Sequence, residues 1–307
     1  MRASPPPRRL VSHGSILVDL ALAVPHLPLR GGDVLARQGS ISVGGGFNLL
    51  SAAARLGLPG VYAGQHGTGP FGDRVRAALA AEGLELLQPA DPALDTGYCV
   101  VLLEPDGERT FVTVTGAEAR VDPGLLRDLA YREGDVVYVS GYDLAYPDAG
   151  DAIAGHAGNL PPAVRLVFDP GPLVAEIAPE RLAPVLSRAD LVSLNEREAE
   201  LLGGVDRVLD ACHLSAAMIL RSGASGASIQ RSGAPPFPVP AVAARVIDST
   251  GAGDVHLGAT LAGLARGLTL QESVRLANRA AAYAVSTPGP AAGPTPAQLE
   301  EFGAGRW

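Results

Sequence analysis

The sequence of 307 residues contains no lysine, and all 24 of its basic residues are arginine. A P-loop needs a lysine to contact the phosphates of its nucleotide, and Schiff-base chemistry needs a lysine amine. The absence of lysine therefore excludes both classes of protein. Any phosphate chemistry in this chain must depend on backbone N–H groups, arginine side chains and metal ions.

Long apolar runs and long basic runs are also missing. No apolar run approaches the roughly 18 residues of a membrane-spanning helix, and the opening "MRASPPPRR" is unlike a signal peptide. The net charge is −8 and no basic cluster is longer than "RR", which argues against binding to nucleic acid. We therefore expect no membrane segment and no nucleic-acid partner, with residues 1–9 forming a disordered N-terminus.

Cysteine occurs at two positions, Cys99 and Cys212, which are far apart in the sequence. Their spacing matches neither a metal site nor a disulfide framework. Two buried thiols in a reducing compartment explain them best, and we expect a cytoplasmic location.

The order of apolar and polar residues indicates an α/β fold. The first strand is expected within residues 10–18. After residue 120, helical stretches separate four short apolar runs, which is typical of a parallel sheet buried on both faces; the runs are "DVVYVSG", "RLVFDPG", "ADLVSLN" and "AAMILRSG". Two segments, about residues 20–43 and 94–116, alternate apolar and polar residues instead, and the second contains the hairpin signal "EPDG". We expect one domain over residues 10–302, with these two segments forming a small antiparallel sheet; the alternative is that they extend the main sheet.

The stretch "DSTGAGDVHLG" places three small residues and one carboxylate at the start of a predicted helix. Unpaired N–H groups at a helix N-terminus can bind an anion, helped by the helix dipole. Asp254, which we expect the same field to hold ionised, could take a proton from a hydroxyl beside that anion. This combination suits phosphoryl transfer to an alcohol. The alternative is structural, because glycine and aspartate are common where helices begin.

Two other motifs place polar groups at the N-termini of predicted helices. The run "GGGFN", residues 44–48, lacks the G-x-G-x-x-G spacing of a dinucleotide site, so a dinucleotide-dependent oxidoreductase is poorly supported. The run "ADLVSLNEREAELLGG" places Asn195, Glu196 and Glu198 directly after a predicted buried strand, where Mg²⁺ and phosphates collect in parallel sheets. A capped acidic helix turn would explain Glu196 and Glu200, but it explains Asn195 less well.

Six segments resemble, in this order, the ribokinase-like or PfkB family of carbohydrate kinases over about residues 10–302. They are "GGGFNLLSAAARLG", "GPFGDRVRAALAAEGL", "TGYCVVLLEPDGERTF", "NEREAELLGG", "DSTGAGDVHLG" and "ANRAAAYAVSTPG". The resemblance implies a Rossmann-like, doubly wound α/β fold with a mostly parallel sheet and a small antiparallel β-sheet lid. It also implies transfer of the γ-phosphoryl group of ATP to a primary hydroxyl of a sugar or sugar-like compound, with Mg²⁺ as cofactor.

The resemblance also implies residue roles. Asp254 would be the catalytic base, and the anion hole would consist of the backbone N–H groups of Gly251, Ala252 and Gly253. Hydroxyls of the substrate would bind Asp19, Gly45, Gly46 and Asn48. The ATP site would include Asn195, Arg221, Ser222, Gly223, Gly226 and Asn278, with Arg221 as the cation that neutralises phosphate. Glu198 would act on Mg²⁺ through water, and Asp248 with Thr250 would mark a site for K⁺ or another monovalent cation.

Several positions differ from the family pattern. Gly45 and Gly141-Tyr142 stand where ribokinases carry a lysine and a glutamate, which does not favour ribose as the substrate. The run "GTGPFGD" lacks the acid of the usual Gly-x-Asp, so we expect a different pocket mouth. His256 replaces an aromatic residue and is expected in the core. Arg109 and Glu118 could reach the pocket from the lid.

Two rival functions remain open. A nucleoside kinase of the same family would need an aromatic platform for the base, for which Phe47, Tyr98 and Tyr142 are candidates. A catalytically silent sugar-sensing protein is less favoured, because a sensor needs no catalytic base. The exposed edges of the lid strands would also suit a homodimer that forms through the lid.

Overall fold

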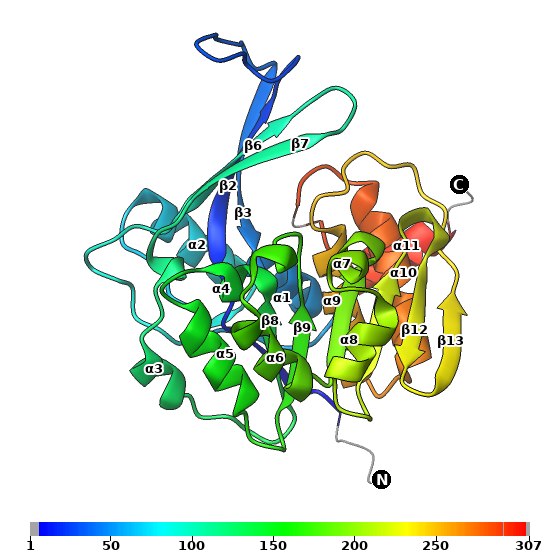
Figure 1. Cartoon of the computed structure of the whole chain (residues 1–307). Helices are drawn as coiled ribbons and strands as arrows, with labels where there is room; N and C mark the ends of the chain where they lie inside the picture. Colours follow the sequence, from blue (N-terminus) through cyan, green and yellow to red (C-terminus); the bar gives the residue numbers. More distant parts are fainter. Residues whose placement is uncertain (1–5, 291, 305–307) are drawn as a thin grey trace.

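The computed structural model describes residues 6–290 and 292–304. Its centre is a nine-stranded sheet in the order β13-β12-β11-β10-β9-β8-β1-β4-β5. Neighbouring strands from β11 to β5 are parallel, whereas β12 and β13 join the sheet in antiparallel orientation. Helices cover both faces of this sheet (Figure 1). The expected doubly wound, mostly parallel α/β fold is confirmed.

The strands of the main sheet are β1 (Arg9–Ser12), β4 (Gly60–Tyr62), β5 (Glu85–Leu86), β8 (Asp135–Ser140), β9 (Arg165–Asp169), β10 (Leu191–Asn195), β11 (Ala217–Arg221), β12 (Ala227–Arg231) and β13 (Ala234–Val239). The helices are α1 (Gly46–Arg55), α2 (Pro70–Ala81), α3 (Pro123–Arg127), α4 (Gly141–Ala145), α5 (Gly150–Gly158), α6 (Pro179–Arg188), α7 (Glu196–Leu201), α8 (Val205–Ala211), α9 (Ala252–Ala265), α10 (Leu270–Val285) and α11 (Pro296–Ala304).

Strand β8 shows why the central strands read as continuous apolar runs. Val136 and Tyr138 belong to the apolar cluster that contains α1, α9 and α10. Val137 and Val139 belong to a second cluster, which contains α5 and α6. Because successive side chains of a strand point to opposite faces of the sheet, both kinds of position must be apolar when helices cover both faces.

A second sheet of four strands stands apart from the main sheet in the order β3-β2-β6-β7 (Figure 1). Its strands are β2 (Ile16–Ala23), β3 (Gln38–Gly45), β6 (Tyr98–Leu103) and β7 (Arg109–Val114); we call them the lid. The outer pairs are antiparallel, as expected, whereas the central pair β2-β6 is parallel because it joins two separate segments of the chain. The alternative that these segments extend the main sheet is therefore wrong.

The register of the lid strands separates two faces. One cross-strand row consists of Ser42, Asp19, Cys99 and Thr113, and Arg109 of β7 points to the same side as this row. The neighbouring row consists of Ile41, Leu20, Val100 and Val112 and points to the other side, which we call the outer face. The lid thus has one face with charged residues and one apolar face.

Two expectations for the N-terminal region are wrong. The sequence predicts one strand within residues 10–18, but β1 ends at Ser12 in the main sheet and β2 begins at Ile16 in the lid, because "HGS" turns the chain between them. Arg9, predicted to be disordered, begins β1 and pairs with Asp135 at 2.7 Å. Residues 1–5 of the predicted disordered segment lie outside the described residues.

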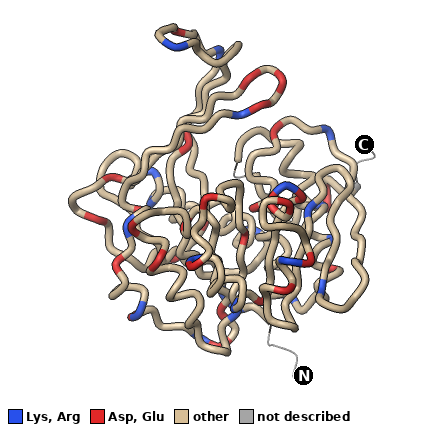
Figure 2. Tube along the Cα trace, in the orientation of Figure 1, with Lys and Arg blue, Asp and Glu red and all other residues tan. Residues whose placement is uncertain are grey.

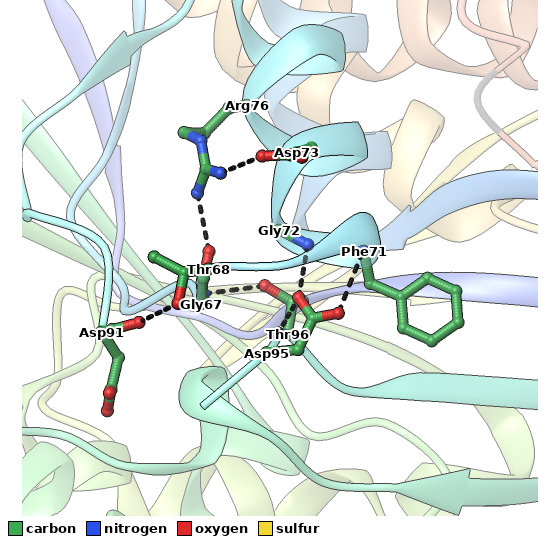
Figure 3. A network of polar contacts seen from close by, with 9 residues as sticks. All are labelled: Gly67, Thr68, Phe71, Gly72, Asp73, Arg76, Asp91, Asp95 and Thr96. Carbon is green, nitrogen blue, oxygen red and sulfur yellow. Dashed lines mark hydrogen bonds and ion pairs between the residues drawn. The ribbon is translucent and has the colours of Figure 1, made fainter. Parts of the chain in front are cut away.

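A carboxylate fixes the base of the lid to α2 (Figure 3). Asp95, three residues before β6, accepts hydrogen bonds from the backbone N–H groups of Phe71 at 3.1 Å and Gly72 at 2.7 Å. The neighbouring Thr96 hydroxyl accepts a hydrogen bond from the N–H of Gly67 at 2.9 Å. An acid beside the first turn of a helix stabilises its unpaired N–H groups. The first turn of α2 carries its own acid, Asp73, but the backbone N–H groups of Phe71 and Gly72 are bound by Asp95 from the base of the lid.

The cysteines differ from expectation in one respect. Cys99 is buried, as predicted, but Cys212 is partly exposed, and both are free thiols. Within residues 6–290 and 292–304, none of the helices combines the length and apolarity that crossing a bilayer requires.

The close packing of α9 on α1 gives a stability prediction. A Cβ on Gly258 would lie 2.7 Å from the carbonyl oxygen of Leu49 and 3.1 Å from the Cβ of Ala52, so Gly258→Ala should push the two helices apart. We expect it to lower the free energy of unfolding by about 1–3 kcal/mol, measured by urea denaturation. Gly155→Ala, in helix α5 with open space at the Cβ position, is the control and should leave stability equal or higher. Equal stabilities for the Gly258→Ala variant and the unmodified protein would contradict the packing argument.

Candidate active site

The ends of four neighbouring parallel strands bring polar side chains to one edge of the main sheet. Strands β8, β9, β10 and β11 end at Ser140, Asp169, Asn195 and Arg221. The register pairs Ser140 with Asp169 and Asn195 with Arg221. All four residues line one cavity of about 910 Å³. Ligands of open α/β sheets bind outside the carboxyl ends of the strands, so this cavity is the candidate site.

The N-terminus of α9 forms another wall of the cavity. Gly251 precedes the helix with a φ of +71°, and a Cβ there would collide with the carbonyl oxygen of Pro290, so only glycine fits well. Helix geometry leaves the N–H groups of the first turn without partners in the helix. Ala252 already donates its N–H to the Ser249 carbonyl at 3.3 Å. Of the three expected anion-hole donors, Ala252 is thus the one whose N–H already has an acceptor within the loop.

Asp254 stands in the first turn of α9 and lines the cavity. It accepts a hydrogen bond from Nδ2 of Asn48 at 3.2 Å. Burial, and after it the negative charge of Asp169, raises the pKa of Asp254 to about 7, although Asn48 and Arg221 act to lower it. Burial thus opposes the ionised state of Asp254 that the helix field was expected to favour. A carboxyl group with a pKa near neutrality is suited to proton transfer.

Arg221 connects the sheet edge to α9. Its Nη2 atom lies 3.1 Å from Oδ2 of Asp169 and 3.3 Å from Oε2 of Glu198. Its Nη1 atom lies against the first turn of α9, where a Cβ on Gly253 would collide with it. Burial raises the pKa of both carboxyl groups, and the charge of Arg221 opposes that rise. The second glycine of "GAG" is thus the residue that leaves room for the arginine.

Asp169 is a residue of the site that sequence reasoning missed. It is buried, it pairs with Arg221, and its Oδ1 accepts the N–H of Gly171 at 3.1 Å. The available signal was an acid directly after the apolar run of "RLVFDPG". Tyr138 and Ser140 of the neighbouring strand also line the cavity and were likewise not predicted.

Asn195 caps helix α7, a structural role that its sequence context did not favour. Its Oδ1 accepts the N–H of Glu198 at 2.8 Å, and Oε2 of Glu198 accepts the N–H of Asn195 at 2.8 Å. This capping box begins α7. Both residues nevertheless line the cavity, so the cap also fixes the Glu198 carboxylate at the sheet edge.

The glycine cluster before α1 allows Asp19 of the lid to approach the main domain. A Cβ on Gly44 would collide with the Asp19 carboxylate, and Gly45 has a φ of +65°. Burial raises the pKa of Asp19 to about 6. Asn48, in the first turn of α1, is buried, and its Oδ1 has no hydrogen-bond partner among the described residues.

The opposite part of the cavity is apolar. It is lined by Ala241, Val242, Ala243, Ala244, Val246, Ala281, Ala282 and Val285. Asn278 fixes the start of this loop, because its Nδ2 donates to the carbonyl oxygens of Val239 at 3.1 Å and Pro240 at 2.8 Å. Its Oδ1 lies 3.0 Å from Nε2 of His256. His256 is buried, as expected, and burial lowers its pKa to about 4.

Most of the predicted site residues line this one cavity. They are Gly45, Gly46, Asn195, Glu198, Arg221, Gly223, Gly226, Gly251, Ala252, Gly253, Asp254 and Asn278. Ser222 and Asp19 are not among the lining residues, and Asn48 contributes through its contact with Asp254.

The aromatic residues considered for stacking on a nucleoside base lie in different parts of the structure, and so does the lid residue Glu118. Tyr142 lines the cavity and is 42% exposed, whereas Phe47 is in the core and Tyr98 packs against Phe71 of α2. Glu118 does not reach the cavity. It is buried at the base of the lid, where its carboxylate accepts the N–H groups of Gly97 and Gly116.

The predicted cation site at Asp248 contains donors instead of a ring of oxygen ligands. Oδ1 of Asp248 accepts hydrogen bonds from Nη2 of Arg109 at 2.8 Å and from the N–H of Thr250 at 2.9 Å. Oδ2 accepts the N–H of Gly289 at 3.2 Å. A metal cation such as K⁺ needs oxygen atoms with free lone pairs facing it. The residues at this carboxylate therefore do not fit a monovalent cation.

Carboxylates at the sheet edge fit Mg²⁺ better. Asp169 and Glu198 are hard oxygen ligands on the same cavity wall, and Mg²⁺ is commonly held by one or two carboxylates together with waters and substrate phosphates. Among the described residues, no group of three or more histidine, cysteine, aspartate or glutamate side chains forms a ready-made metal site. Binding largely through water is consistent with that arrangement.

Comparison with known sequences identifies the family. The sequence pattern of the pfkB family of carbohydrate kinases matches residues 7–298. This chain belongs to the PfkB family. It is 34% identical over 302 residues to the uncharacterized sugar kinase YegV of Escherichia coli, a match that covers 93% of this chain and 91% of that protein. The predicted class, a phosphotransferase with an alcohol group as acceptor, is thereby confirmed.

Solved structures of PfkB-type kinases share the fold. Ribokinase from Cryptococcus neoformans, solved with ADP, matches with a TM-score of 0.81 and 24% identity, covering 97% of this chain and 99% of that one. The nucleoside kinase of Burkholderia thailandensis, solved with inosine, matches with a TM-score of 0.79 and 23% identity, covering 96% of this chain and 95% of that one. At these identities the likeness concerns the fold.

The raised pKa of Asp254 predicts how stability responds to pH. A carboxyl group with a folded pKa near 7 and an unfolded pKa of about 3.9 stabilises the fold only at low pH, and this contribution is lost as the pH rises through 7. Asp254→Asn should therefore raise the melting temperature by roughly 2 °C or more at pH 8, and the gain should shrink toward pH 4. Asp148→Asn, at an exposed position, is the control. A gain that does not depend on pH would contradict the burial argument.

Proposed function

We propose that this PfkB kinase transfers the γ-phosphoryl group of ATP to a primary hydroxyl of a sugar or sugar-like compound. The observation that carries the proposal is the arrangement at the start of α9, where Asp254 lies beside the N–H groups of the first turn and next to Arg221. A base, an anion-binding helix end and a cation together supply what phosphoryl transfer to an alcohol requires.

In this proposal Asp254 accepts the proton of the acceptor hydroxyl. The hydroxyl oxygen then bonds to the γ-phosphorus while the bond to the bridging oxygen of ADP breaks, so ADP leaves with the bonding electron pair. The helix N–H groups from Gly253 onward and the guanidinium of Arg221 would stabilise the negative charge on the transferring group. The N–H of Gly251 would join them, whereas Ala252 would mainly shape the turn, since it donates its N–H to the carbonyl of Ser249.

Mg²⁺ would be held by Glu198 and Asp169, largely through water, and would neutralise phosphate charge. Arg221 already contacts both carboxylates, which leaves the three groups together with one net negative charge when both acids are ionised. A residual negative charge at this wall favours a divalent cation there.

ATP use is supported by the apolar lining of part of the cavity. The loop of residues 241–246 and the small residues of α10 line it with apolar side chains together with Asn278, which suits an adenine ring. Gly223 and Gly226 border the same region. The related ribokinase structure with ADP supports the same choice of nucleotide.

The acceptor would bind between the lid and α1. Asp19 faces Gly44, and Asn48 combines a bond to Asp254 with an unpaired, buried Oδ1. Carboxylate and amide oxygens accept hydrogen bonds from sugar hydroxyls. We propose that residues 10–302 form a single kinase domain into which the lid strands are inserted, and that the lid excludes water from the transfer.

A nucleoside is the second candidate acceptor. Tyr142 lines the cavity with an exposed ring that could stack on a base, and the similar nucleoside kinase structure contains inosine. We propose a cytoplasmic location for either activity, since ATP is the donor and both cysteines are free.

The kinase proposal is tested by ATP consumption with Mg²⁺ against pentoses, hexoses, sugar acids and nucleosides. We expect one acceptor class to drive ADP release, and Asp254→Asn to lower turnover at least ~100-fold because it removes the base. Arg221→Ala should raise the Michaelis constant for ATP or lower turnover, whereas the exposed Asp148→Asn should change neither. If no acceptor turns over, while thermal shifts show a sugar or nucleoside binding equally to the protein and to Asp254→Asn, the sensing alternative is favoured.

The outer face of the lid supports a homodimer as a further proposal. Ile41 and Val112 of this face are 50% and 56% exposed, and a second copy with the same apolar face is the occupant that would cover them. Light scattering should give twice the 31.3 kDa of one chain, and Val112→Asp should yield the monomer mass. Leu214→Asp, at an 88% exposed position on the main domain, is the control. A monomer mass for the unmodified protein would refute the dimer.

A further inference from the structure

Arg109 connects the lid to the loop that precedes α9. It begins β7 and shares the lid face of Asp19. Its Nη2 atom lies 2.8 Å from Oδ1 of Asp248, and its Nη1 atom lies 3.3 Å from the Ser249 hydroxyl. Figure 2 shows acidic residues gathered at the tip of the β6–β7 hairpin. Arg109 nevertheless pairs with an acid 139 residues away in the sequence.

The Asp248 carboxylate organises the loop around it. It accepts the N–H of Thr250, two residues ahead, and the N–H of Gly289, in the segment after α10. Burial opposes its ionisation, but hydrogen bonds from the backbone and side chain of Thr250 and from the backbone of Gly289, together with the charge of Arg109, outweigh burial and hold the pKa of Asp248 below its ordinary value. An ionised Asp248 thus holds together two loop segments and needs one nearby positive charge.

The same loop leads directly into the proposed anion hole. Only Ser249 and Thr250 separate Asp248 from Gly251, and the carbonyl of Ser249 accepts the N–H of Ala252. Any displacement of Asp248 is therefore transmitted to the first turn of α9, where Asp254 and the helix N–H groups stand. Geometric errors of about 1 Å at such a site can cost about 100-fold in rate.

We propose that Arg109 is the permanent cation of this loop and replaces the monovalent ion that the family resemblance suggests at Asp248. The guanidinium and the N–H of Thr250 bind Oδ1 of Asp248, and the N–H of Gly289 binds Oδ2, so donors already contact both oxygens that an ion would use. Arg109 then acts as a positioning residue: when the lid lies over the cavity, its guanidinium fixes the Asp248 loop and, through it, the anion hole. This inference rests on the proposed phosphoryl transfer, in which that loop positions the N–H groups that bind the transferring phosphoryl group.

The arrangement has two consequences. The enzyme should need no K⁺, because the charge at Asp248 is balanced by a side chain that never loses its proton. The site should also be complete only while the lid is in place, since the charge comes from the lid itself. Removing the guanidinium would leave an ionised carboxylate with its two N–H partners and an open position, into which a small cation could enter.

The experiment compares KCl with choline chloride, each at about 100 mM so that screening is equal. Melting temperature is measured first, because it does not depend on turnover, and the kinase rate second. The unmodified protein should melt and turn over equally in both salts. Arg109→Ala should lose roughly 10- to 100-fold in rate in choline chloride, and KCl should raise its melting temperature and restore at least part of the rate.

Matched variants distinguish the effect of losing the positive charge from the effect of disturbing the lid structure. Arg30→Ala removes an exposed arginine elsewhere in the lid connection and should show no response to KCl. Arg109→Lys keeps a positive charge and should stay independent of KCl, and Arg109→Gln tests the same position if the alanine variant does not fold. The proposal is overturned if KCl stabilises or activates the unmodified protein, or if neither uncharged variant responds to KCl. Absence of turnover with every acceptor would instead refute the proposed function, and the melting temperatures would still test the role of Arg109.

Discussion

The guanidinium of Arg221 lies against the backbone of Gly253, where any side chain would displace it. From that position it pairs with Asp169 and Glu198 and lowers the pKa of Asp254. Without this charge, three carboxyl groups would share a cavity with little water, and each would raise the pKa of the others. The pKa of Asp254 would then rise further, and a smaller fraction of this carboxyl group would be ionised and able to accept a proton at neutral pH. The small residue at 253 thus controls the electrostatics of the site as well as the shape of the helix start.

The lid depends on contacts at both of its ends. At its base, Asp95 and Glu118 accept backbone N–H groups and fix the strands to α2 and to each other. On the lid face that carries the charged residues, Asp19 packs over Gly44 and Arg109 pairs with Asp248. The base contacts are buried or partly buried hydrogen bonds to backbone N–H groups, whereas the Arg109 pair is a partly exposed ion pair, a class that contributes little to stability. The Arg109–Asp248 pair can therefore separate while the hydrogen bonds at the base of the lid stay formed.

The sequence predicts the elements whose signal is local and misses those whose signal depends on tertiary contacts. The central strands were predictable because burial on both faces requires continuous apolar runs. The break between β1 and β2 was not, because apolar residues on both sides of "HGS" serve two different sheets. "GAGD" could be recognised as a motif, but Asp169 could not, since a single acid after a strand has no pattern and its pairing with Arg221 follows from sheet register. The charge state of Asp254 also depends on burial, which only the folded chain determines.

The absence of lysine has a consequence for how the site responds to pH. Arginine side chains are charged throughout the neutral range, and burial lowers the pKa of His256 to about 4, so its ring is neutral near pH 7. The cationic groups of the site therefore do not titrate in the working range. The groups that do are carboxyl groups raised by burial, Asp254 to about 7 and Asp19 to about 6. As the pH falls through this range, the site loses negative charge and keeps all of its positive charge, so it becomes better at holding phosphate while it loses its base.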